Sequence, residues 1–450
     1  MHRILMVAYH FAPDNASGTH RSLHFARALH EHGHDVHVVT APLQALRTTD
    51  PSLNDIFPYP DRIHRSDFRR TLGEIYLATR RRGAAGAGTS RPQGTPSPQE
   101  ERVHDVEPKH SPLTLLRRTV AAWDALPDHQ RGWYRSAVRV GRQLARTRKI
   151  DAVFASGPPW TGILVAARLS RGLGCPLVVD FRDPWTGNTG RQTPYDFEWC
   201  HWIAKRWEKS VLRRASLALF NSPAIMERAV KSYGEVGRRP VRAILNGSDA
   251  PRREHASGIP PHAEIRFSHF GNLYRGRSVM PLINGIESLV EKGVVKPREV
   301  AIELIGRRAE EVESLCASPP DGILIRATST LPFHEAVSQM MEPSVLLVAQ
   351  PPNLSVQIPT KLYDYLCTGN PVVVMASEDS ATWRVASRFP RCRRVDYSDG
   401  RYNAAILADL VQSWKAGALE QERTVDDTAA LTKARISEEF VEAIEELLDD

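Results

Sequence analysis

The sequence predicts an α/β protein with two Rossmann-like domains, each built on a parallel sheet. The chain has 450 residues, more than the roughly 250–300 at which a single hydrophobic core stops growing. Short β-branched, apolar runs alternate with segments of helical periodicity along most of its length. Residues 358–374 predict a loop, a short helix and a strand in succession. Since this strand is apolar on both faces, it is typical of a parallel sheet covered by helices on both sides.

The first domain is predicted at residues 1–245 and opens with a strand, a helix and a second strand. The strands are expected at 3–8 and 36–39, and the loop before the helix ends with Ser17 and Gly18. This loop lacks the G-x-G-x-x-G pattern, so a dehydrogenase with a tightly bound dinucleotide is disfavoured. Gly18 at a helix N-terminus can approach a phosphate or a sugar. The alternative is a simple turn glycine.

A charged and aromatic loop follows the strand predicted at 177–179. Ligands of open α/β sheets bind at the carboxyl ends of the strands, so this loop is a candidate site. It places Asp180, Arg182, Asp183 and Trp185 at the strand end. The alternative is that Arg182 and Asp183 form a structural ion pair that closes a turn.

Residues 80–112 are rich in glycine, proline, serine and charge, which predicts a disordered surface insertion. The net charge of +7 is compatible with nucleic acid, an anionic membrane surface or phosphorylated small molecules. Arg80, Arg81 and Arg82, with Arg117 and Arg118 nearby, can contact acidic lipid headgroups, although a solvated loop is the simpler interpretation. No motif of a nucleic-acid reader is found, so nucleic acid is not an expected partner.

The second domain is predicted at residues 246–418, after the turn-forming sequence Asn-Gly-Ser-Asp at 246–249. A strand at 265–270 leads into a loop that contains Gly271, Arg275, Gly276 and Arg277. Glycines allow close backbone approach, and guanidinium groups match phosphate oxygens, so this loop suits a diphosphate. Two solvated arginines are the alternative. Residues 419–450 predict a charged helical tail that returns to the first domain.

Lys361 lies in the first turn of the helix predicted within residues 358–374. The helix dipole disfavours a cation there, while the free N–H groups favour an anion. A lysine at this position is therefore expected if a phosphate lies between its amine and the N–H groups at the helix start. Asp364 shares its face of the helix and can accept hydrogen bonds from sugar hydroxyls. A solvated Lys361–Asp364 pair is the alternative.

The sequence shows neither a membrane-spanning segment nor a signal peptide, and its cysteines form no recognised pattern. No apolar run reaches the roughly 18–20 residues that span a bilayer, and residues 1–9 lack the apolar segment of a signal peptide. We therefore expect a cytoplasmic protein, with a peripheral position at the inner face of the membrane as an option. The five cysteines show no CxxC spacing, so neither a zinc site nor a disulfide framework is expected.

Five segments, in this order, resemble glycosyltransferases of the GT-B fold and of family four. They are the loop ending at Ser17-Gly18, the sequences DFRDPW, NGSD and GNLYRGRS, and the sequence IPTKLYDYLCTGNPVV, and the resemblance extends from residue 2 to about 415. It implies parallel sheets in two domains that face each other across a cleft. The first domain would bind the acceptor and the second the nucleotide sugar. It also implies retention of configuration at the anomeric carbon.

The resemblance assigns roles to individual residues. Arg275 or Arg277, with Lys361 and Gly271, would hold the donor diphosphate, and Asp364 replaces the glutamate that binds ribose. The Ser17-Gly18 loop would contact the acceptor or a phosphate. Two departures occur: the earlier glutamate of the family signature falls at Val356, and no histidine stands in the DFRDPW segment. Asp183, supported by Arg182, is therefore the candidate catalytic residue.

The expected activity is a retaining, hexosyl-type transfer from a UDP- or GDP-linked sugar to a glycan, lipid-linked or small-molecule acceptor, as in polysaccharide biosynthesis. No cofactor is expected. No Asp-x-Asp sequence occurs, so no metal is expected, and arginine and lysine would meet the leaving charge instead. The alternatives are a sugar-nucleotide epimerase or hydrolase of the same fold, or a non-catalytic basic protein that binds membrane or nucleic acid.

Overall fold

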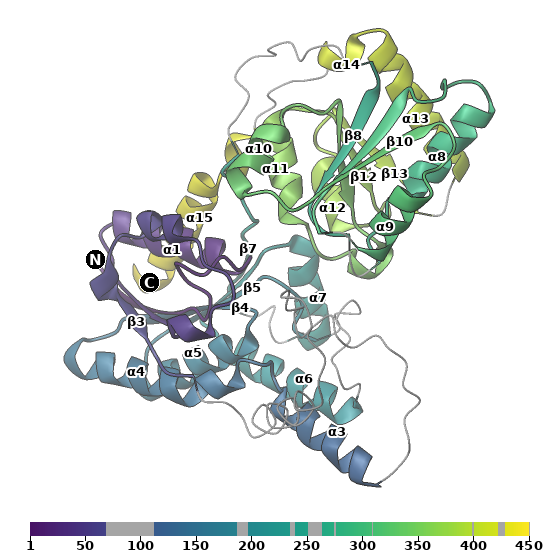
Figure 1. Ribbon diagram of the computed structural model, residues 1–450. Coiled ribbons are helices and arrows are strands. Elements are labelled where there is room, and N and C mark those ends of the chain that lie inside the picture. The colour runs from purple at the N-terminus through teal and green to yellow at the C-terminus, as the bar shows by residue number, and fades with distance from the viewer. Residues whose placement is uncertain are drawn as a thin grey trace. The chain divides into compact units, whose positions relative to one another are not determined.

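A computed structural model describes residues 1–68, 112–186, 197–234, 239–250, 263–273, 276–307, 309–397, 400–421 and 428–449. The predicted insertion, apart from Pro112, lies outside the described residues, and so does Arg275. The chain forms two compact units (Figure 1). The first comprises Met1–Phe220, Ala229–Arg242 and Phe440–Asp450, and the second comprises Asn221–Arg228 and Ala243–Glu439.

The first unit is built on a seven-stranded sheet with the order β3-β2-β1-β4-β5-β6-β7. The six neighbouring strands from β3 through β6 in this order pair in parallel. Parallel strands need long crossover connections, which helices supply here. The strands are β1 (Arg3–Val7), β2 (Asp35–Thr40), β3 (Ile63–Arg65), β4 (Ala152–Gly157), β5 (Leu177–Phe181), β6 (Leu217–Phe220) and β7 (Val241–Ala243).

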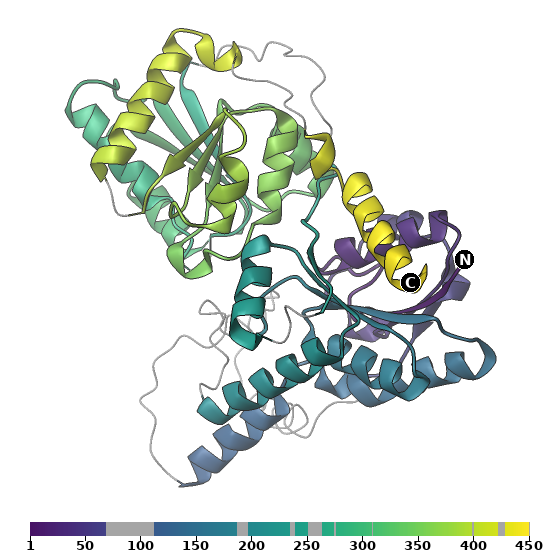
Figure 2. The ribbon, with the colours of Figure 1, turned by 180° about the vertical axis from the view of Figure 1, so that it is seen from behind.

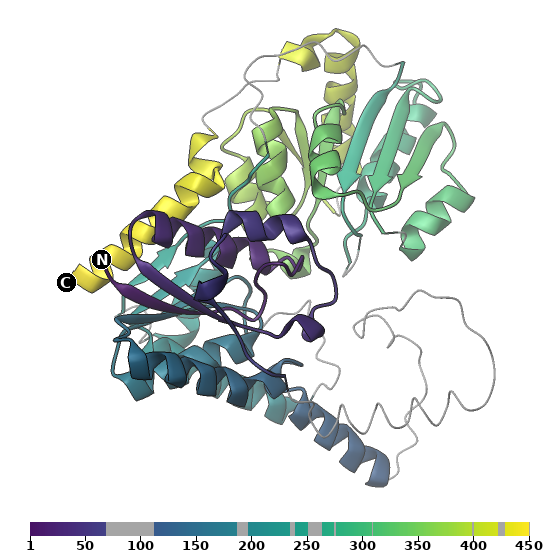
Figure 3. The ribbon, with the colours of Figure 1, turned by 60° about the vertical axis from the view of Figure 1, so that its left-hand side comes forward.

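Helices cover both faces of this sheet. One face carries α4 (Tyr134–Thr147), α5 (Trp160–Leu173) and α6 (Glu198–Arg214), with α3 (Pro112–Asp124) beside α6; the other carries α1 (Thr19–Glu31) and the end of α15 (Lys433–Asp449) (Figures 1 and 2). Figure 3 shows the same two layers from another side. The first unit also contains the short helices η1 (Leu43–Ala45), η2 (Pro51–Ile56), η3 (Pro60–Arg62) and η4 (Arg131–Trp133). Helix α7 (Pro223–Tyr233) begins in the second unit and ends in the first.

The C-terminal part of α15 packs on the core of the first unit. The ring of Phe440 stacks on Phe25 of α1 at a centroid distance of 3.9 Å and contacts the edge of Phe154 on β4. Both partners are fully buried. The last helix of the chain therefore completes the hydrophobic core beneath its first helix.

The second unit is built on a six-stranded parallel sheet with the order β10-β9-β8-β11-β12-β13. Its strands are β8 (Ile265–Phe270), β9 (Val300–Ile305), β10 (Ile323–Thr328), β11 (Val345–Ala349), β12 (Val372–Met375) and β13 (Cys392–Val395). Its helices are α8 (Met280–Glu291), α9 (Glu310–Ala317), α10 (Phe333–Gln339), α11 (Thr360–Thr368), α12 (Ala381–Ala386), α13 (Gly400–Lys415), α14 (Ala418–Gln421), η6 (Pro352–Leu354) and η7 (Ala429–Leu431).

Two hydrophobic clusters sandwich this second sheet. Leu282 of α8 and Leu407 of α13 pack on one face, and Leu362 of α11 and Val385 of α12 pack on the other. The central strands are buried on both sides, which explains their continuous apolar runs. The predicted α/β class with two parallel sheets is confirmed.

Candidate active site

The amine of Lys361 lies at the carboxyl end of β8, in the second unit. Lys361 is the second residue of α11, whose N-cap Pro359 makes no side-chain capping bond in the described structure. The first N–H groups of this helix therefore point to a place where an anion can be bound. The Lys361 Nζ atom lies 3.1 Å from Nε2 of His269.

His269 is a buried residue near the end of β8. Its Nδ1 lies 3.0 Å from the carbonyl oxygen of Leu347 on β11, so Nδ1 carries the hydrogen and donates it. Nε2 is then left as an acceptor for the Lys361 amine. Burial and the charge of Lys361 hold the pKa of His269 well below its usual value, so the ring is neutral at pH 7.

The ammonium group of Lys361 is destabilised by its surroundings. Burial, and after it the positive charge of Arg277, lowers the pKa of Lys361 to about 7, while Asp364 acts in the opposite direction. A bound anion would favour the charged form and raise this pKa again. The electrostatics of the site therefore favour a ligand with negative charge.

Gly271 lies directly beneath the Lys361 amine. Its φ of +113° strongly favours glycine, and a Cβ atom there would lie 2.7 Å from Lys361 Nζ. The Gly271 N–H donates to the carbonyl oxygen of Ile305 at 2.7 Å, which ties the ends of β8 and β9 together. The glycine thus lets the lysine lie on the backbone of the strand end.

Arg277 approaches the same place from the loop after β8. Its Nη2 donates to Oε1 of Gln350, although the separation of 3.4 Å is long. The buried Gln350 in turn donates from Nε2 to the carbonyl oxygens of Leu354 (2.7 Å) and Gln357 (3.1 Å). Gln350 therefore shapes the loop that leads to the start of α11.

Asp364 is buried one turn further along α11. Its Oδ1 accepts a hydrogen bond of 2.6 Å from the Ser248 hydroxyl. Burial raises the pKa of Asp364 to about 6, and the Ser248 bond opposes this shift. Val356, where the family signature has a glutamate, contributes its carbonyl oxygen, which accepts from the Ser222 hydroxyl at 2.9 Å.

The candidate residues of the first unit also lie together. A Cβ atom on Gly18 would lie 2.6 Å from Nη1 of Arg182, so the guanidinium group rests on the backbone where α1 begins. Arg182 donates to the carbonyl oxygens of Gly157 and Pro158 after β4. Asp183 follows it and is partly buried, whereas Ser17, before Gly18, is exposed. The ends of β4 and β5 and the start of α1 thus form one cluster.

A buried ion pair fixes this cluster. Nε and Nη2 of Arg21 each donate to Asp180 at 2.9 Å, and the Ser156 hydroxyl donates to the same carboxylate at 2.6 Å. Arg21 lies in the first turn of α1, and Asp180 lies on β5. The pair therefore holds the start of α1 against the sheet.

A family model described as a glycosyl transferase 4-like domain matches residues 18–247. The chain belongs to this family. The protein is therefore a glycosyltransferase of family four that uses a nucleotide-sugar donor, and enzymes of this family retain the anomeric configuration. The resemblance predicted from the sequence is confirmed. A search of curated proteins found no significant match.

Solved structures of similar fold cover nearly the whole chain. HepE from Anabaena, in complex with UDP and glucose, is 12% identical with a TM-score of 0.58, and the match covers 99% of this chain and 100% of that one. Sucrose-phosphate synthase from Thermosynechococcus elongatus is 13% identical (TM-score 0.61, 100% of both chains). Trehalose 6-phosphate synthase from Burkholderia multivorans is 12% identical (TM-score 0.59, 100% and 97%). The shared fold is GT-B.

The loop after β5 of this glycosyltransferase is held by aromatic and carboxylate contacts. Trp185 stacks on Trp160 at 5.0 Å with nearly parallel rings. The buried Glu208 of α6 accepts hydrogen bonds from the hydroxyls of Thr186 and Tyr233. The segment that carries Arg182 and Asp183 is therefore anchored on its C-terminal side.

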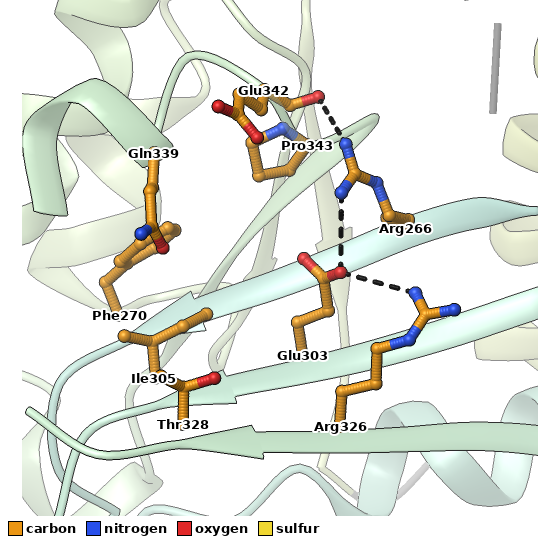
Figure 4. Close-up of a pocket in the computed structure, with 9 residues that line it drawn as sticks. All are labelled: Arg266, Phe270, Glu303, Ile305, Arg326, Thr328, Gln339, Glu342 and Pro343. Carbon is orange, nitrogen blue, oxygen red and sulfur yellow. Dashed lines mark hydrogen bonds and ion pairs between the residues drawn. The ribbon is translucent and has the colours of Figure 1, made fainter. Parts of the chain in front are cut away.

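A cavity of about 140 Å³ lies on the sheet of the second unit (Figure 4). Glu303 lies between Arg266 and Arg326, with nitrogen–oxygen distances of 3.6 and 3.4 Å. Because these guanidinium groups face a carboxylate, the cavity does not favour a diphosphate. Its lining contains none of the residues assigned to the donor; it is formed by Arg266, Phe270, Glu303, Ile305, Arg326, Thr328, Gln339, Glu342 and Pro343.

Sequence patterns assign no side-chain role to four residues of these clusters. His269, Gln350 and Ser248 contact the donor residues, and His10 pairs with Asp14 (Nδ1–Oδ2 2.5 Å) in the loop that ends at Gly18. The available signal was position, because His269 and Gln350 stand next to the carboxyl ends of strands. Their partners are distant in sequence, so spacing alone could not identify them.

Proposed function

We propose that the enzyme transfers a hexosyl group from a UDP- or GDP-linked donor to a glycan, lipid-linked or small-molecule acceptor, without a metal ion. The observation that carries this proposal is the position of Lys361 on Gly271 and His269, at the start of a helix that has no capping side chain in the described structure. Fixed donors at this position suit a phosphate. The UDP and UDP-glucose complexes of HepE support UDP as the first donor to test.

In this proposal the donor diphosphate lies against Lys361, Arg277 and the first N–H groups of α11. Arg275 remains part of the assignment from its position in the sequence. When the sugar leaves, negative charge develops on the diphosphate, and these groups stabilise it in the transition state. In this arrangement the cations are held in place before the reaction, so little reorganisation is needed when the charge appears.

Asp364 is assigned to the ribose. Its carboxylate has two oxygens, of which Oδ1 accepts from Ser248, so the other remains to accept a hydrogen bond from a ribose hydroxyl. The Ser248 bond also fixes the orientation of the carboxylate. Asp364→Ala should therefore weaken nucleotide binding more than it changes the rate of sugar transfer once the donor is bound.

We assign the acceptor to the first-unit cluster. Asp183 would orient the acceptor hydroxyl or take its proton, and Arg182 would hold the loop against Gly18 and β4. Transfer breaks the bond between the anomeric carbon and the diphosphate oxygen and forms a bond to the acceptor oxygen on the same face of the sugar. Ser17 and Gly18 would line this position.

A thermal-shift screen with UDP, GDP and ADP and their sugars tests the donor first. A bound nucleotide raises the stability by RT ln(1 + [L]/Kd), so the correct base gives the largest shift. Release of nucleoside diphosphate from the matching donor then measures turnover. We expect Lys361→Ala and Arg277→Ala each to lower it about 100-fold or more, and the exposed Lys292→Ala to leave it unchanged. Near-normal rates in both site variants would remove the diphosphate assignment.

The acceptor assignment has a separate test. Asp183→Asn should abolish sugar transfer while nucleotide affinity stays within a few fold of the wild type. Asp55→Asn is the control, because it makes the same change at an exposed carboxylate of the first unit, outside this cluster. A fully active Asp183→Asn enzyme would refute the catalytic role.

A further inference from the structure

Four arginines form one stripe along α4 in the first unit. Arg135, Arg139, Arg142 and Arg146 follow one another at spacings of four, three and four residues, and all are exposed. This spacing places them on one face of a helix. They are the only charged residues of α4. The opposite side of the helix is buried, so the stripe points away from the sheet.

The same layer continues this charge on α5 and α6. Exposed Arg168 and Arg171 are the charged residues of α5, which has no acidic residue. On α6, the exposed face carries Lys205, Arg206, Lys209 and Arg213. The two acidic residues of α6 are Glu198 in its first turn and the buried Glu208. The three helices lie side by side on one face of the sheet, so the stripes form one broad cationic surface, here called the basic layer (Figures 1 and 2).

The end of α15, on the opposite face of the same sheet, carries negative charge. The part of α15 that packs there contains Glu442, Glu445, Glu446 and Asp449 and has no Lys or Arg. Three of these are paired within the unit: Glu445 with His34, Glu446 with Arg242, and Asp449 with His2. The end of α15 therefore has a charge opposite in sign to that of the basic layer, which leaves the basic layer as the surface of this unit suited to an anionic partner.

Exposed aromatic side chains lie at one end of the basic layer. Trp202 on α6 is 60% exposed and Trp123 on α3 is 48% exposed, although both are large apolar residues. Each lies beside a cation: Arg206 is 4.8 Å from the Trp202 ring centre, and Arg131 is 4.8 Å from that of Trp123. A small cluster that includes Ala122 and Cys200 holds α3 against α6.

We propose that the basic layer, with Trp123 and Trp202 at its edge, docks on the surface of a bilayer that contains anionic lipids. Lys and Arg near such a surface each contribute attraction, and tryptophan is favoured at the level of the headgroups. Helices that lie flat present their stripes to a plane. A nucleic-acid duplex would use the cations but presents no unstacked base to the exposed indole rings, and the sequence contains no motif of a nucleic-acid reader, so the membrane is favoured.

This surface differs from the membrane contact predicted at Arg80–Arg82. Those residues lie outside the described part of the chain. The basic layer consists of α4, α5 and α6, and it contains none of the residues assigned to donor or acceptor. Docking through it would therefore leave the chemistry of transfer unaffected while it places the enzyme at a lipid surface.

Vesicle co-sedimentation of the full chain tests whether the cations of the basic layer bind anionic lipids. We expect binding to phosphatidylcholine vesicles with 30% phosphatidylglycerol, at least tenfold weaker binding to pure phosphatidylcholine, and release as salt rises. Arg142→Glu/Arg146→Glu and Lys205→Glu/Lys209→Glu should each weaken binding about tenfold or more. Arg27→Glu/Arg47→Glu is the control, because it makes the same change in net charge outside the basic layer. Equal losses in the control and in the two test variants would overturn the proposal.

The exposed tryptophans and the alternative partner, a nucleic acid, are each tested in a separate experiment. Quenching of tryptophan fluorescence by brominated lipid should fall in Trp202→Phe and in Trp123→Phe, and unchanged quenching in both would exclude insertion at this edge. Binding to duplex DNA and to single-stranded RNA is measured at the same salt. Inorganic phosphate at millimolar concentration should not displace the vesicles. Tighter binding to nucleic acid than to anionic vesicles, lost in the same charge variants, would also overturn the proposal.

Discussion

The Nζ atom of Lys361 lies 3.1 Å from Nε2 of His269, and the other ring nitrogen of His269 donates to the backbone of β11. A lysine is thereby held by a neutral acceptor instead of a carboxylate. The arrangement fixes the direction of the amine without cancelling its charge. His269 therefore does not compete with a ligand for the charge of Lys361, while burial and Arg277 lower the pKa of Lys361 to about 7.

Nucleotide affinity should depend on pH through Lys361. Burial and Arg277 lower the pKa of Lys361 to about 7, so the free enzyme loses this proton as pH rises through 7, and a bound diphosphate favours the charged form. Affinity for UDP or GDP should therefore fall from pH 7 to 9, with proton uptake on binding near pH 8. Isothermal titration calorimetry in two buffers of different ionisation enthalpy measures both the affinity and the number of protons taken up.

Lys361→Arg is the control for this pH dependence, because arginine stays charged over the whole range. The pKa of Asp364 is raised to about 6, below the range tested, and His269 stays neutral because its pKa is lowered. Identical pH profiles for the wild type and Lys361→Arg would contradict the assignment.

His269 should act by positioning Lys361. His269→Ala removes the acceptor and opens space for water around the amine, so we expect about tenfold weaker nucleotide binding, as for the loss of one charge-assisted hydrogen bond, and a higher pKa for Lys361. The fall in affinity should then begin at higher pH than in the wild type. His269→Gln, which keeps an oxygen acceptor, should recover part of the affinity. A destabilised variant with an unchanged pH profile would point to a structural role alone.

Gly271→Ala should damage the site more than an ordinary glycine substitution. The new Cβ would lie 2.7 Å from Lys361 Nζ, and φ is +113°, so we expect a loss of about 1–3 kcal/mol in stability together with weaker nucleotide binding. Gly33→Ala is the matched control for backbone strain, because the φ of Gly33 is +82° and nothing lies within 4 Å of the Cβ atom that alanine would add. Thermal unfolding and nucleotide titration of both variants separate backbone strain from displacement of the lysine. Equal nucleotide affinity in the two would exclude the displacement.

Local signals explain why the fold was predictable. The central strands β11 and β12 are buried on both faces and appear as apolar runs, and the helices between the strands show their own periodicity. Gly271 and Lys361 were likewise visible because each occupies a position with its own chemistry, a strand end and a helix start. Their contact follows from the adjacency of β8 and β11, which a parallel sheet makes natural.

Contacts between distant segments explain what was missed. Ser248 and Asp364 are 116 residues apart, and Arg21 and Asp180 are 159 apart, yet each pair is joined by buried hydrogen bonds. Asp180 was singled out as a site candidate from its loop, whereas the structure gives it a partner on α1. A charged residue at a strand end can thus serve the scaffold or the ligand, and the sequence does not separate the two.

Arg21→Met should destabilise the first unit strongly because it leaves Asp180 as a buried charge. Both side chains are almost wholly buried, at 7% and 0% exposure, and within the described part of the chain the Ser156 hydroxyl would be the carboxylate's remaining hydrogen-bond donor. Removing one partner of such a pair costs about 3–5 kcal/mol. Arg27→Met on the same helix is the control, because the Arg27–Glu31 pair is about half exposed and contributes about 0.5 kcal/mol or less. The double variant Arg21→Met/Asp180→Asn should recover part of the loss, since the unpaired charge is gone. Urea unfolding of the four proteins measures these differences, and equal costs for Arg21→Met and Arg27→Met would show that the buried pair does not hold α1 in place.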